Sequence, residues 1–116
     1  MDLHNRLLLD DNILIITVHE PVATEDRAAL AQAIDLLIDE HHPAALVITL
    51  DPDAGTPAAV SVILRTHRYC AEHSIPMAAV TSHPATRCLI RSNEPALPVH
   101  LHTDHALLTA RTLLRR

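Results

Sequence analysis

The chain has 116 residues, with 14 acidic side chains against nine arginines and no lysine, so its formal net charge is −5. This length is typical of one domain, here residues 1–116. The negative charge and the near absence of aromatic side chains argue against a nucleic-acid partner. No apolar run approaches the ~20 residues that span a membrane, and the start of the chain has no basic leader. We therefore expect a cytoplasmic protein.

The first third of the chain predicts a β-hairpin followed by an amphipathic helix. RLLLD (residues 6–10) and ILIITV (residues 13–18) flank an Asp-Asn pair, which tolerates the left-handed backbone of a short turn. Thr24 is the expected N-cap of the helix, which should end just before Pro43. Apolar residues recur at helical spacing. The expected inward stripe is Leu30, Ile34, Leu37 and Ile38.

The rest of the chain predicts alternating strands and helices. Residues 45–50 form a continuous apolar run, as expected of a strand that is covered on both faces. The further expected elements are a helix over 58–73, a strand over 77–81, a helix over 84–91, a half-exposed strand over 99–102 and a last helix capped by Thr103. This alternation predicts an α/β domain with mostly parallel strands and right-handed crossovers.

The order and lengths of these segments resemble the STAS family, which comprises the anti-sigma-factor antagonists and related bacterial regulators. The resemblance covers roughly residues 5–114 and is carried by ILIITVHEPV, ALVITL, VSVILRTHRYCAEHSIPMAAVTSHPATRCLI and VHLHTDHALL. It implies a mixed, mostly parallel sheet with an N-terminal hairpin and four helices, in the order β-β-α-β-α-β-α-β-α.

The chain departs from the functional motif of that family. Typical members carry an Asp-Ser-Ser-Gly-like run at the start of the second helix, and a partner kinase phosphorylates one of its serines. Aligned through VILR, this chain has Thr56-Pro57-Ala58-Ala59 there, with Ala58 at the acceptor position. Aligned from ALVITL, Ala59 takes that position. Because neither register places a hydroxyl there, the resemblance implies a member without the usual switch serine.

The stretch around Gly55 is expected to be a capped turn. Thr56 followed by Pro57 suits the N-cap and first position of a helix. Phosphorylation of Thr56 or Ser61 is the less favoured alternative. Gly55 is the only glycine in the chain, and we expect it to supply a positive φ in this turn.

A partner-binding surface is expected at the strand-end loops and on the outer side of the second helix. A helical wheel predicts that the inward residues are Val60, Ile63, Leu64, His67 and Ala71, and that Ser61, Arg65, Arg68 and Glu72 form the neighbouring face. Val62 and Tyr69 then point outward, as partner-binding apolar residues often do. Packing beneath a neighbouring element is the alternative. The predicted partner-binding residues are Glu20, Asp51, Asp53, Gly55, Thr56, Pro57, Ala58, Ser61, Val62 and Tyr69.

Ten histidines give only one cluster with the spacing of metal ligands, His100-x-His102-x-x-His105. His100 and His102 would share one face of a strand, and His105 would lie at the start of the next helix. Solvent-facing residues of an edge strand are the favoured interpretation, so we predict no metal or other cofactor. No glycine-rich phosphate loop, GxSxG or HExxH motif is present, and we expect no enzymatic activity.

The sequence therefore predicts a non-enzymatic regulator that works by protein interaction, either as a constitutive binder or as a scaffold. Its partner would be an anti-sigma factor, a serine kinase-like regulator or other STAS proteins. Formation of a homodimer is a further alternative. The alternative is a small-ligand or metal sensor that uses the strand-end pocket or the histidine cluster.

Overall fold

The computed structural model describes residues 3–115; Met1, Asp2 and Arg116, the ends of the predicted domain, lie outside the described residues. The elements are β1 (Leu3–Leu8), β2 (Ile13–Val18), α1 (Arg27–His41), β3 (Ala45–Leu50), α2 (Pro57–Glu72), β4 (Met77–Val80), α3 (Pro84–Asn93), β5 (Val99–His100) and α4 (Thr103–Leu114), with short 3-10 turns at Thr24–Asp26 and Pro52–Ala54. The predicted order of strands and helices is confirmed.

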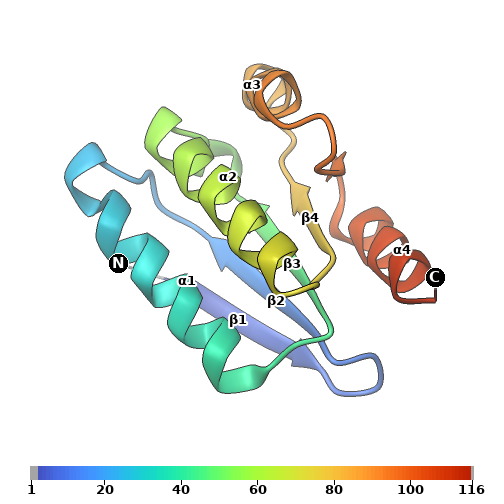
Figure 1. The fold of residues 1–116 in the computed structure, drawn as a ribbon. Helices are drawn as coiled ribbons and strands as arrows, with labels where there is room; N and C mark the ends of the chain where they lie inside the picture. Colours follow the sequence, from blue (N-terminus) through green and yellow to red (C-terminus); the bar gives the residue numbers. More distant parts are fainter. Residues whose placement is uncertain (1–2, 116) are drawn as a thin grey trace.

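The five strands form one sheet in the order β1-β2-β3-β4-β5. β1 pairs with β2 in antiparallel fashion, and the other neighbours are parallel. Figure 1 shows α1 and α2 side by side across one face of the sheet, with α4 on the other face. The predicted mixed, mostly parallel sheet is therefore confirmed.

The two central strands are buried on both faces. Leu14 and Ile16 of β2 and Leu46 and Ile48 of β3 belong to the core beneath α1 and α2. The alternate residues of the same strands belong to the second core, beneath α4: they are Ile13, Ile15, Ala45 and Val47. Successive side chains point to opposite faces, so a strand covered on both sides must be apolar throughout.

The hairpin differs in detail from the prediction. β1 spans Leu3–Leu8, so residues 9–12 form the connection to β2. Asn12 takes the left-handed conformation, with φ of 54°, and its side-chain amide donates to the carbonyl of His42 at 3.0 Å. Asn tolerates this backbone region better than most residues. The hydrogen bond ties the hairpin turn to the end of α1.

Two of the predicted N-caps are wrong. Thr24 lies within the 3-10 turn that precedes α1, and Thr103 is the first residue of α4. In each case the preceding residue, Ala23 or His102, is the last one with an extended backbone. A capping side chain must come from that extended residue, and neither threonine occupies it.

The last strand is shorter than predicted. β5 contains only Val99 and His100, which pair with Ala79 and Val80 of β4. The chain leaves the sheet after His100 to begin α4 at Thr103. Across residues 3–115, none of the helices has the length and apolar character needed to cross a bilayer.

A core substitution tests the two-sided burial of the central strands. Ile48 is fully buried, whereas Leu36 on α1 is 67% exposed. We expect Ile48→Ala to lower the free energy of unfolding by about 2–5 kcal/mol, because it removes buried methyl groups and leaves a cavity. Leu36→Ala, the matched control, should change it by less than ~0.5 kcal/mol. Urea denaturation measures both values, and similar losses would contradict the assignment.

Candidate partner-binding surface

Three connections meet at one edge of the sheet. The carboxyl ends of parallel strands lie at the same edge, so the loops that follow β2, β3 and β4 converge there. The backbone amide of Asp51, just after β3, donates to the carbonyl of Val18 at the end of β2, at 3.0 Å. The loop 19–23 and the turn 51–56 are thereby held side by side.

Thr56 is the N-cap of α2, as predicted. Its Oγ1 accepts a hydrogen bond from the backbone amide of Ala59 at 3.1 Å. The same hydroxyl donates to the carbonyl of Val22, in the loop after β2, at 2.8 Å. One oxygen therefore caps the helix and also fixes the neighbouring loop.

Both alanines at the predicted acceptor position are buried. Ala58 is 7% exposed and Ala59 is 1% exposed, and both belong to the core beneath α1 and α2. At both positions predicted for the acceptor, the start of α2 thus presents a packed methyl group. Ala58, predicted as a partner-binding residue, contributes almost no accessible surface.

Gly55 has a different role from the predicted one. Its φ is −77°, so the expectation of a positive φ is wrong. A Cβ at this position would lie 2.6 Å from Oγ1 of Thr86 on α3. That Thr86 hydroxyl donates to the carbonyl of Gly55 at 3.3 Å. Glycine is needed here because α3 approaches the turn closely.

A chain of hydrogen bonds that sequence analysis missed fixes Asp51. His19 donates from Nδ1 to the Asp51 carboxylate at 2.7 Å, and its Nε2 lies 2.9 Å from Nδ1 of His4 on β1. Asp51 thus serves to order the loop after β2. The available signal was positional, because His19 and Asp51 each follow the last residue of adjacent parallel strands.

Several predicted residues remain accessible at this edge. Glu20, Asp53 and Pro57 are exposed, while Gly55 and Thr56 are half-buried. We call these five residues the strand-end surface. Ser61, also predicted, is half-buried one turn further along α2 and lies in the groove between α1 and α2.

The predicted outward direction of Val62 is wrong. Val62 is 2% exposed and belongs to the core beneath α1 and α2. Ala71, predicted to point inward, is exposed. The buried residues of α2 are Ala58, Ala59, Val60, Val62, Ile63, Thr66 and Cys70. α2 packs against α1 as well as the sheet, so its buried face is turned toward α1 relative to the predicted stripe.

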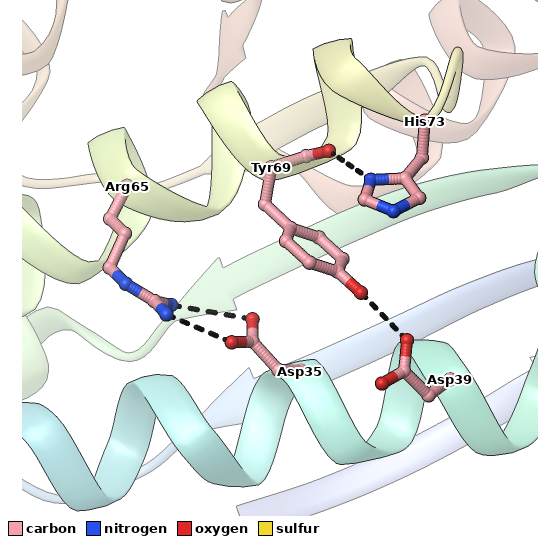
Figure 2. A network of polar contacts seen from close by, with 5 residues as sticks. All are labelled: Asp35, Asp39, Arg65, Tyr69 and His73. Carbon is pink, nitrogen blue, oxygen red and sulfur yellow. Dashed lines mark hydrogen bonds and ion pairs between the residues drawn. The ribbon is translucent and has the colours of Figure 1, made fainter.

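Tyr69 also faces α1. Its ring is packed against the core and its hydroxyl donates to Asp39 of α1 at 2.7 Å, as Figure 2 shows. This hydrogen bond, together with desolvation and the nearby carboxylates, raises the pKa of Tyr69 to about 12. Tyr69 lies about 20 Å along the helix from Thr56. It therefore does not belong to the strand-end surface.

The three histidines near the C-terminus do not converge on one point. Nε2 of His100 lies 2.9 Å from the Thr109 hydroxyl, while the rings of His102 and His105 contact each other edge to face at 5.8 Å. Burial, with smaller effects of His105 and Arg91, lowers the pKa of His100. Among residues 3–115, no group of three or more His, Cys, Asp or Glu side chains is arranged to hold a metal ion.

Comparisons with known proteins identify the fold. No protein-family model matches the chain, and no curated protein matches it. Solved structures that are similar over nearly their whole length include two regulators of bacterial origin. A serine-to-glutamate variant of RsbS from Moorella thermoacetica is 12% identical, covers 100% of both chains and has a TM-score of 0.78. An anti-sigma factor antagonist from Mycobacterium paratuberculosis is 21% identical, covers 95% of both chains and has a TM-score of 0.72. The chain has the fold of a STAS domain, as the sequence resemblance predicted.

Thr56 offers a direct test of the turn. Thr56→Ala removes the hydroxyl that binds Ala59 and Val22. We expect it to lower the free energy of unfolding by about 1–2 kcal/mol, because the helix loses its cap and the loop loses a partner. Thr56→Ser keeps the hydroxyl and should cost less than half as much. Equal losses in urea denaturation would show that the hydroxyl does not contribute.

A double-mutant cycle tests the contact between the turn and α3. Gly55→Ala should destabilise the protein by about 1–3 kcal/mol, because the new methyl group collides with the Thr86 hydroxyl. In a Thr86→Ala background the same change should be neutral or stabilising, since alanine can adopt the negative φ of Gly55 and reduces the conformational freedom of the unfolded chain. We expect a coupling energy above ~1 kcal/mol from chemical denaturation. Additive effects would contradict this explanation of the glycine.

Proposed function

We propose that this chain is a non-enzymatic regulatory domain that binds a partner protein through the strand-end surface and needs no phosphorylation switch. The partner is an anti-sigma factor, a serine kinase-like regulator or another STAS domain, a second copy of this chain included. The domain works in the cytoplasm as a constitutive binder or as a scaffold subunit.

The state of Thr56 is the observation that carries this proposal. Its hydroxyl is already used twice, as donor to Val22 and as acceptor from Ala59. The neighbouring residues on α2, Ala58 and Ala59, have no hydroxyl and are buried. Adding phosphate to Thr56 would break the hydrogen bond that fixes the loop after β2. The start of α2 is thus built as a fixed surface.

The structural neighbours support a regulatory function. One is an anti-sigma factor antagonist, and the other is a form of RsbS. The exposed residues of the strand-end surface also suit protein recognition. Glu20 and Asp53 supply charge from the loops that follow β2 and β3, and Pro57 adds an exposed apolar ring at the start of α2. A basic patch on the partner would complement the two carboxylates.

Quantitative affinity capture from an extract of the source organism tests the proposal. The baits are the wild-type chain, Asp53→Arg and the matched control Asp10→Arg. Both aspartates are exposed, but Asp10 lies in the hairpin turn, at the other end of the strands. We expect the wild type and the control to retain an anti-sigma factor, a kinase-like regulator or a STAS protein, and Asp53→Arg to lose it by at least about tenfold.

The other outcomes contradict separate parts of the proposal. Equal capture by all three baits would place the partner elsewhere on the molecule. Absence of any such partner from every eluate would overturn the interaction function and favour the small-ligand or metal sensor. An intact-mass gain of one phosphate on the recovered bait would overturn constitutive binding and restore Thr56 or Ser61 as the acceptor.

A further inference from the structure

A groove between α1 and α2 concentrates positive charge on an otherwise acidic protein. It has a volume of about 420 Å³, and its polar lining consists of Arg27 and Gln32 from α1 and Ser61, Arg65 and Arg68 from α2. We call these residues the arginine groove. Its floor includes Ala31 and Val62, which are 5% and 2% exposed. Three of the nine arginines of the chain thus surround one small apolar floor.

Resting on the proposed function, we propose that the arginine groove binds an acidic segment of the partner protein. The strand-end surface would make the first contact, and the groove would take carboxylate side chains that extend from it. Ser61 follows Thr56 by five residues of α2, about 8 Å along the helix, so the two regions adjoin.

The charge of the groove is only partly compensated within the chain. Arg65 forms a two-pronged ion pair with Asp35 of α1, with N–O distances of 3.3 and 2.9 Å, as Figure 2 shows. Hydrogen bonding and attraction to Asp35 raise the pKa of Arg65. Within residues 3–115, neither Arg27 nor Arg68 forms an ion pair. Two guanidinium groups in the groove therefore remain available to external carboxylates.

The pair between Arg65 and Asp35 also shows the geometry that the groove supports. The planar guanidinium reaches across the seam between the helices and holds both carboxylate oxygens. Guanidinium groups bind carboxylates in this forked manner with stronger hydrogen bonds than neutral donors. Arg27 and Arg68 can offer the same fork to a segment that lies along the seam, and Ser61 and Gln32 add neutral polar contacts.

The shape of the groove favours a protein segment over other anions. The groove is open to solvent along one side, whereas sites for small ligands enclose most of the ligand surface. The net charge of −5 would repel a long nucleic acid. Bases would also find no free aromatic ring for stacking, because Tyr69, the only Phe, Tyr or Trp residue of the chain, is stacked on His73. Arginines around a buried apolar floor match the composition of protein interfaces.

Fluorescence anisotropy with a defined probe tests the inference without the natural partner. The probe is a fluorescein-labelled peptide of alternating glutamate and alanine, titrated with the full chain at low ionic strength. We expect binding that weakens as salt is added, because the contacts are solvent-exposed charges. The double variant Arg27→Glu/Arg68→Glu should lose at least about tenfold in affinity. Urea denaturation of each variant verifies that it is folded.

The matched control carries the same change of charge elsewhere. Arg6→Glu/Arg115→Glu alters two exposed arginines outside the groove and should change the affinity less than about threefold. Equal losses of affinity in the two double variants would show that only net charge matters and would contradict peptide binding in the arginine groove. A labelled single-stranded oligonucleotide that binds as well as the peptide, or displacement of the peptide by millimolar inorganic phosphate, would overturn the assignment to an acidic protein segment.

Failure here is distinguishable from failure of the proposed function. If Asp53→Arg abolishes partner capture while Arg27→Glu/Arg68→Glu leaves it unchanged, the strand-end surface is confirmed as the binding site and the role of the arginine groove is rejected. If the peptide binds through the arginines but no regulator is captured, binding of acidic segments by the groove is confirmed and the proposed class of partner is rejected.

Discussion

Burial of β2 and β3 on both faces is the constraint on which the arrangement of this molecule depends. A polar group in the middle of either strand would lose its contact with water and gain no adequate partner. The polar residues within these strands, Thr17 and Thr49, are half-buried and lie next to the carboxyl ends. Polar chemistry for recognition therefore comes from outside these two strands, for example from the loops beyond them and from the seam between α1 and α2. The strand-end surface and the arginine groove occupy these two places.

Local sequence patterns predicted the features that depend on local physics. Unbroken apolar runs marked β2 and β3, and Thr56-Pro57 marked the start of α2, because a cap and a first helical residue are adjacent in the chain. Contacts between distant segments were not predictable in this way. The approach of Thr86 to Gly55 joins residues 31 positions apart, so the glycine was assigned to the turn alone. The face of α2 was misplaced because Thr66 and Cys70 are buried although neither is strongly apolar.

The hydroxyl of Thr56 connects the fold to the proposed constitutive binding. A switch serine has to be accessible, and its phosphate acts by adding charge to a surface that a partner must contact. Here the hydroxyl is engaged by two backbone groups, and the next two alanines extend the helix while burying their methyl groups. Alanine is the best helix former, so these residues also favour the helical start. Ala58 and Ala59 therefore stabilise the start of α2 and, under the proposed function, offer no hydroxyl for modification.

Charge distribution decides what such a fixed surface can recognise. At physiological ionic strength, solvent largely screens charges that are more than about 8 Å apart, so a partner segment responds most strongly to the charges beneath it and only weakly to the net charge of −5. Glu20 and Asp53 lie at the strand ends, while Arg27 and Arg68 flank the adjoining groove. A surface that is negative at one end and positive along the next helix pair favours one orientation of a partner with the opposite pattern. A partner docked in reverse would bring like charges together, which is unfavourable. In the proposed complex the two neighbouring patches would therefore determine orientation as well as attraction.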